Sequence, residues 1–102
     1  MTAREELPFE TLIWCGITIH IRYEARYLGL ADLSHLDIEA VSPERAKLPI
    51  TETGYRSHFF NGSETVAEYG GPLGYVRAWL DAEAATPEWR AQQQAARQMT
   101  LF

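Results

Sequence analysis

The feature that most constrains the fold is the alternating stretch TLIWCGITIHIRY at residues 11–23. Side chains of a β-strand point to opposite faces in turn, so this pattern of β-branched residues predicts one continuous strand with a buried face. The inward face would hold Ile13, Cys15, Ile17, Ile19, Ile21 and Tyr23. The other face would hold Leu12, Trp14, Gly16, Thr18, His20 and Arg22. Because this second face becomes polar along the strand, we expect an antiparallel sheet with one solvated side.

Two later segments predict further strands, HLDIEAV at 35–41 and ITETGYRSHFF at 50–60. The alternation of the first places Leu36, Ile38 and Ala40 inward and His35, Asp37 and Glu39 outward. Gly54 inside the second segment indicates a bulge or a close approach of another backbone. The intervening SPERAKLP at 42–49 predicts a single helical turn, because serine caps helices and proline fits the first helical position.

The C-terminal part carries helix signals. SETVAEYGG at 63–71 predicts a short helix, and the segment 71–85 predicts an amphipathic helix that covers the sheet, since its apolar residues recur every three or four positions. TPEW at 86–89 is a third helix start, with Thr86 as the capping residue and Pro87 at the first position. The helix that follows, to about residue 98, is rich in Ala, Gln and Arg and has little to bury.

These elements predict an α+β fold: a small antiparallel sheet of about three strands, one packed amphipathic helix, and a polar C-terminal helix with a tail. The 102 residues suit one domain. We divide the chain into an N-terminal arm at 1–10, an α+β domain at 11–85 and a helical extension at 86–102 that ends in a linear motif.

The net charge of −5 argues against nucleic acid as a direct partner, because phosphate binding needs a basic face. The sequence has neither an apolar run long enough to span a membrane nor the apolar segment of a secretory signal. The single cysteine, Cys15, excludes an internal disulfide framework and favours a cytoplasmic location. No phosphate-binding loop or metal-ligand spacing is present, so no cofactor is predicted.

The polar side of the predicted sheet holds the candidate catalytic residues, which are His20, Glu52, Arg56 and His58. A histidine beside a carboxylate is an acid–base pair, and arginine can hold an anion. A metal site formed by the three histidines, His20, His35 and His58, is a second possibility. The third is an ordinary solvated face, on which opposite charges pair across strands.

The chain ends in Gln98, Met99, Thr100, Leu101 and Phe102. This sequence resembles the linear motif by which bacterial proteins dock on the β sliding clamp of DNA polymerase III. The resemblance implies that Gln98 is the polar anchor, that Met99 takes the aliphatic position, and that Thr100 is a spacer. Leu101 and Phe102 would then fill an apolar pocket. Met99 departs from the commoner leucine, but methionine adapts to irregular pockets.

The sequence thus favours a small bacterial accessory or regulatory protein that docks on the β sliding clamp, in DNA replication, repair or mobile-element maintenance. Two alternatives for the tail stay open: it packs on its own domain beside Trp79 or Trp89, or it has no specific role. For the whole chain the alternatives are a small enzyme or ligand-binding domain that uses the polar sheet face, and a homo-oligomeric interaction domain. Residues 12–84 resemble small uncharacterised proteins of bacteria.

Overall fold

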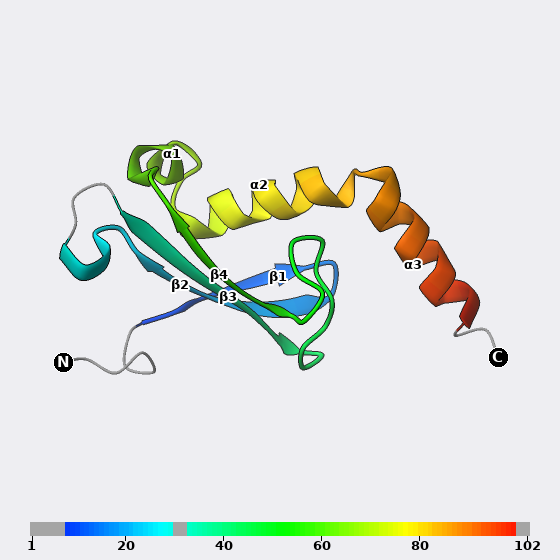
Figure 1. Cartoon of the computed structure of the whole chain (residues 1–102). Helices are drawn as coiled ribbons and strands as arrows, with labels where there is room; N and C mark the ends of the chain where they lie inside the picture. The colour runs from blue at the N-terminus through cyan, green and yellow to red at the C-terminus, as the bar shows by residue number, and fades with distance from the viewer. Residues whose placement is uncertain (1–7, 30–32, 100–102) are drawn as a thin grey trace.

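A computed structural model describes residues 8–29 and 33–99 of the chain. Its elements are β1 (Glu10–Trp14), β2 (Ile17–Glu24), the short 3₁₀ helix η2 (Tyr27–Gly29), β3 (Ser34–Ser42), β4 (Tyr55–Phe60), α1 (Ser63–Glu68), α2 (Pro72–Ala84) and α3 (Pro87–Met99). The strands form one antiparallel sheet in the order β1-β2-β3-β4, and α2 runs along one side of it (Figure 1). This architecture confirms the predicted α+β class.

The described sheet has four strands because the stretch 11–23 is a hairpin and not a single strand. Trp14 pairs with Ile17, and Cys15 and Gly16 form a two-residue turn between them. Both turn residues have positive φ, 49° and 79°, as in the type I′ turns that match the twist of a hairpin. The prediction of one continuous strand was therefore wrong.

The hairpin reverses the assignment of faces in its first half. Leu12 lies opposite Ile19, so both side chains enter the core, and Trp14 is also buried. Ile13, predicted inward, is 58% exposed, and Cys15 lies exposed in the turn. Alternation along 11–23 could not reveal this. Across the two-residue turn, the core-facing positions change from even numbers in β1 to odd numbers in β2.

The core lies between the sheet and α2. Val76 and Leu80 of α2 are fully buried against the sheet, and the indole Nε1 of Trp14 donates a 2.8 Å hydrogen bond to the carboxylate of Asp81. The buried apolar residues of the sheet side are Leu12, Trp14, Ile19, Ile21, Leu36, Ile38, Ala40, Leu48 and Ile50. The inward positions predicted for the second strand are confirmed by this core.

The connection between β3 and β4 departs from the prediction. Residues 42–49 form turns and isolated bridges in place of a helical turn, and β4 begins only at Tyr55. The backbones of Leu48 and Thr51 exchange hydrogen bonds of 2.9 and 3.0 Å, which closes a tight turn and directs Leu48 and Ile50 into the core. The burial of these two apolar side chains overrides the local helix signal.

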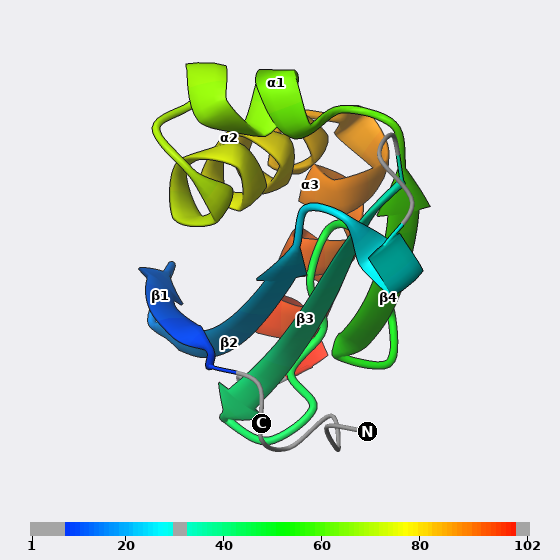
Figure 2. The same cartoon turned by 90° about the vertical axis from the view of Figure 1, so that its left-hand side faces the viewer.

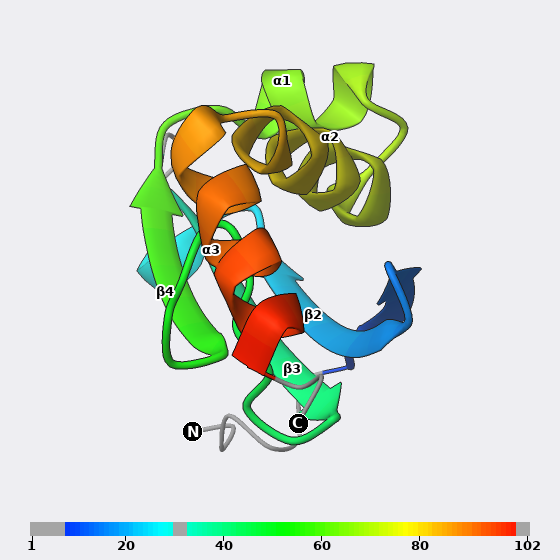
Figure 3. The ribbon, with the colours of Figure 1, turned by 90° about the vertical axis from the view of Figure 1, so that its right-hand side faces the viewer.

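The predicted C-terminal helices are confirmed as α1, α2 and α3. Thr86 caps α3, since its hydroxyl accepts a hydrogen bond from the backbone N–H of Trp89. Figures 2 and 3 show α1 and α2 on the same side of the sheet, whereas α3 turns away from α2 and passes the end of the sheet. Trp89 packs against the core, but residues 90–97 of α3 are exposed. None of the described helices is long and apolar enough to cross a membrane.

Candidate functional site

The three histidines do not share one face of the sheet. His20 and His35 lie on the side away from α2, which we call the open face and which also carries Arg22, Asp37, Glu39, Tyr55, Ser57 and Phe59. His58 lies opposite the buried Leu36, on the side that α2 covers, and its ring is 4.7 Å from that of Trp79. A joint site of these three histidines is therefore not assembled, and the described residues contain no group of three or more potential metal ligands.

The other two predicted catalytic residues are also separated from His20. Glu52 is exposed in the connection before β4. Arg56 shares the helix-covered side with His58, where its guanidinium lies 5.1 Å from the ring centre of Trp79 and donates a 2.9 Å hydrogen bond to the carbonyl of Ile50. The structure therefore brings Arg56 and His58 to one face, but it does not bring His20 to them.

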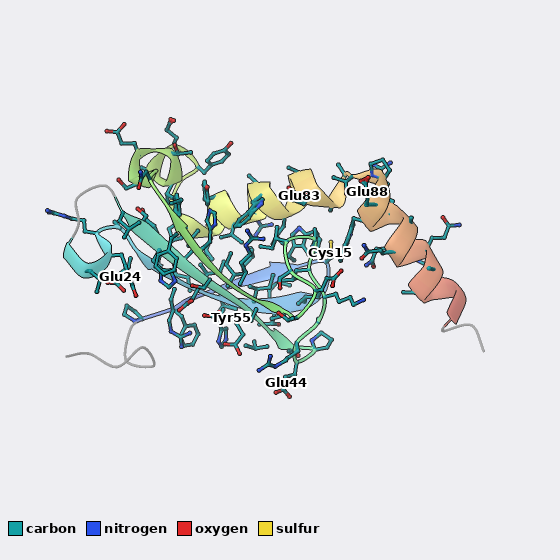
Figure 4. The ribbon with its side chains drawn as sticks, in the orientation of Figure 1. Cys15, Glu24, Glu44, Tyr55, Glu83 and Glu88 are labelled. Carbon is teal, nitrogen blue, oxygen red and sulfur yellow. The ribbon has the colours of Figure 1, made fainter. Side chains whose placement is uncertain are left out.

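The open face contains a different polar cluster, the His35 cluster, formed by His35, Asp37, Tyr55 and Ser57 of β3 and β4. The register places Asp37 directly opposite Ser57. The Nε2 atom of His35 lies 2.6 Å from the hydroxyl of Ser57 and 3.5 Å from Oδ1 of Asp37. The Tyr55 hydroxyl donates a 2.8 Å hydrogen bond to that same Oδ1 atom (Figure 4 labels Tyr55).

Two members of this cluster are buried although they lie on the open face. His35 is 3% exposed and Asp37 is 4% exposed. The ring of Phe59 stacks on the imidazole at 4.4 Å, and Tyr27 of η2 lies 4.9 Å from it. The sequence led us to expect a solvated side of the sheet, but His35 and Asp37 on that side are buried. The rings of Phe59 and Tyr27 cover the imidazole of His35.

Sequence reasoning did not single out Ser57 and did not pair it with His35. The signal that could have found it is the alternation of YRSHFF, which puts Tyr55, Ser57 and Phe59 on one face. Which residues of β3 lie next to these side chains depends on the register between β3 and β4. That register is a tertiary property, since 12 residues of turns and bridges separate the two strands.

The chemistry of the cluster depends on one nitrogen. Ser57 and Asp37 both approach Nε2 of His35. A neutral Nε2 can accept the Ser57 proton, and a protonated Nε2 can donate to either neighbour. This differs from the arrangement in a Ser-His-Asp triad, where the carboxylate holds the other ring nitrogen. Asp37 is nevertheless placed to stabilise the imidazolium that forms when Nε2 gains a proton.

The first two strands extend the open face. Arg22 pairs across β2 and β3 with Asp37, which brings a guanidinium-bearing residue beside the cluster. Phe9 stacks on His20 at 4.0 Å, and its ring lies 5.3 Å from the Arg22 guanidinium carbon. Phe9 and Phe59 are 46% and 50% exposed, so the face combines polar groups with accessible aromatic surface.

The opposite side of β4 borders a shallow pocket of about 370 Å³. It is lined by His58, Tyr69, Tyr75, Ala78, Trp79 and Ala82. Burial, then the positive charge of Arg56, then that of His35 lower the pKa of His58 below its ordinary value of 6.5. The pocket is therefore lined by aromatic rings and a preferentially neutral imidazole.

The lowered pKa of His58 makes stability depend on pH. Near pH 6.5 the unfolded chain binds more protons at this residue than the folded chain. The contribution of His58 to the free energy of unfolding is therefore complete above its ordinary pKa and is lost as the pH falls through its folded pKa. We expect His58→Gln to lose less stability than the wild type between pH of about 8 and about 5 in urea titrations. An equally steep loss of stability with falling pH in both proteins would contradict the lowered pKa of His58.

The fold and the cluster define a small α+β domain with a four-stranded antiparallel meander, covered by helices on one side. Residues 9–89 match the model of the family described as KlcB third domain, and the chain therefore belongs to this family. Membership indicates a small bacterial accessory protein. Comparison with curated proteins and with solved structures gave no match. Residues 90–102, which include the tail motif, lie beyond the matched span.

Proposed function

We propose that the chain is a bacterial accessory protein that docks on the β sliding clamp through Gln98–Phe102, in DNA replication, repair or mobile-element maintenance. The tail sequence carries the proposal, since it resembles the clamp-binding motif, with Met99 in place of the commoner leucine. The relation to the KlcB third domain supports an accessory, plasmid-related setting. Gln98 and Met99 are the last residues of α3, and Thr100, Leu101 and Phe102 lie outside the described residues.

The described part of α3 supports docking by the segment that follows it. Residues 90–97 are exposed and polar or small, so this part of the helix is not used to build the core. The last four carbonyl groups of any helix lack intrahelical partners, and helix ends fray. Gln98 and Met99 can therefore leave the final turn at small cost when a partner binds them.

The binding energy expected from the motif is modest. Burial of Met99, Leu101 and Phe102 would contribute about 1.5–3 kcal/mol for each side chain. Ordering of the segment and loss of translational freedom offset a large part of this gain. We therefore expect a dissociation constant on the order of micromolar, which suits a transient partner.

Calorimetric titration of the purified chain into a bacterial β clamp tests the proposal. The double variant Leu101→Ala/Phe102→Ala should bind about 100-fold more weakly or worse, because it loses both pocket side chains. Gln98→Ala should weaken binding by up to about tenfold, the value of one hydrogen bond. Gln94→Ala is the matched control on the exposed part of α3 and should bind like the wild type.

Two results would refute clamp docking: absence of binding by the intact chain, or unchanged affinity of the double variant. Urea denaturation of the same proteins separates this proposal from packing of the tail on its own domain. A pocket of about 390 Å³ lies between the hairpin turn and α3, lined by Trp14, Cys15, Ile17, Lys47, Trp89, Gln93 and Arg97. If the tail filled it, the double variant would be less stable than the wild type, and clamp binding would compete with that packing.

A further inference from the structure

The geometry of the His35 cluster carries an inference that is independent of clamp docking. We propose that Ser57 is a nucleophile activated by His35, and that it takes up an acyl group from an activated ester with an apolar or aromatic acyl part. The Ser57 hydroxyl lies 2.6 Å from Nε2 of His35, within the range required of a general base and its proton donor. Ser57 is exposed whereas His35 is buried, so a reagent reaches the hydroxyl and water is kept from the imidazole.

The neighbours of the pair support proton transfer from Ser57 to His35. When Nε2 takes the proton it becomes positively charged, and Oδ1 of Asp37 lies 3.5 Å away to stabilise that charge. The Tyr55 hydroxyl donates to the same carboxylate oxygen at 2.8 Å and holds it in place. Asp37 and Tyr55 are thus positioning residues, and His35 is the base.

The surroundings of Ser57 indicate the class of substrate. Tyr55 and Phe59 stand two residues before and after Ser57 on the same face, and they are 39% and 50% exposed. An apolar or aromatic acyl group can lie on these rings while its carbonyl carbon meets the Ser57 oxygen. β4 is an edge strand of the described sheet, so the ester can approach from the side as well as from above.

The chemical step is an acyl transfer that needs no further reagent. The Ser57 oxygen forms a bond to the carbonyl carbon of the ester, and its proton moves to Nε2 of His35. The bond from the carbonyl carbon to the alkoxy or aryloxy oxygen breaks, and the proton on Nε2 passes to that leaving oxygen. The products are the ester of Ser57 and a free alcohol or phenol, with His35 neutral again.

An aryl-substituted fluorophosphonate is a suitable probe, because it reacts with activated serines and releases fluoride. Intact mass spectrometry of the full chain should show one phosphonyl group added, and peptide mapping should place it on Ser57. Ser57→Ala should abolish this adduct. Ser42→Ala is the matched control: Ser42 is an exposed serine of β3, and its replacement should leave labelling unchanged.

Replacement of the base distinguishes activation from chance reactivity. His35→Gln should slow labelling by about 100-fold or more, the usual contribution of a general base. Because replacement of the His35 ring by a different shape can unfold the chain, Asp37→Asn provides a second variant of unchanged shape: it keeps an acceptor for Tyr55 but removes the charge. It should slow labelling about tenfold or more while circular dichroism and urea stability show a folded domain.

The proposal is overturned if the folded wild type is not labelled at Ser57. It is equally overturned if folded His35→Gln, or folded Asp37→Asn, is labelled as fast as the wild type. In either case the cluster is a structural hydrogen-bond network that provides partners for the buried polar atoms of His35 and Asp37. Neither result bears on clamp binding, which is measured separately with the tail variants.

Discussion

Replacing Leu80 by alanine should lower the free energy of unfolding by about 2–5 kcal/mol, the largest effect we expect from a single core substitution. Leu80 is fully buried, and α2 uses it together with Val76 to close the core over the sheet. The loss combines the transfer free energy of the removed atoms with the cost of the cavity left behind. Nearly all of this cost should appear as a lower urea midpoint at an unchanged slope.

The matched control for this substitution is Leu28→Ala. Leu28 lies in η2 and is 76% exposed, so its truncation removes little buried surface. Its free energy of unfolding should stay within about 0.5 kcal/mol of the wild type. Similar losses at both positions would contradict the packing of α2 on the sheet, and with it the division into a helix-covered face and an open face.

The second large effect is expected for Gly54→Ala, at about 2–5 kcal/mol of destabilisation. Gly54 has a φ of +80°, which costs an L-residue about 1–2 kcal/mol. A Cβ atom added there would lie 2.6 Å from backbone atoms of Arg45, which adds about 1–3 kcal/mol of overpacking. A 2.7 Å hydrogen bond from the N–H of Ala40 to the carbonyl of Gly54 holds the Gly54 backbone in this position near Arg45.

Gly70→Ala separates these two costs. Gly70 has a similar φ of +83°, but a Cβ added there meets nothing within 4 Å. This variant should lose only the backbone term, about 1–2 kcal/mol. Equal destabilisation of the two variants in thermal or urea unfolding would show that the contact between Gly54 and Arg45 does not exist in solution.

Local signals in the sequence were sufficient for the helices and for β3. Pro72 and Thr86 mark the starts of α2 and α3. Proline fits the first position of a helix, and the Thr86 hydroxyl accepts a hydrogen bond from a backbone N–H of the first turn. Leu36 and Ile38 are buried as their alternation predicts. The close backbone approach at Gly54 was one of the two interpretations that this glycine suggested, and the structure supports it.

The candidate site was less predictable because it depends on pairing between strands. His58 was predicted to lie on the same face of the sheet as His20, but the register of β4 on β3 places it opposite Leu36, on the helix-covered side. The same register brings Ser57 next to His35, an association that no spacing along the chain reveals. The prediction of an acid–base site at His20, Glu52, Arg56 and His58 assumed one continuous register through 50–60, and β4 starts only at Tyr55.

The sequence by itself determined the α+β class, the helices α1, α2 and α3, and the tail motif, because periodicity, capping and a short linear pattern are properties of neighbouring residues. Only the tertiary structure decided the hairpin at Cys15–Gly16, the burial of His35 and Asp37, and the pairing of Ser57 with His35. The last two features arise from contacts between residues distant along the chain, above all the strand register and the aromatic cover supplied by Tyr27 and Phe59. A shift of one residue in that register would move every side chain of β4 to the other face.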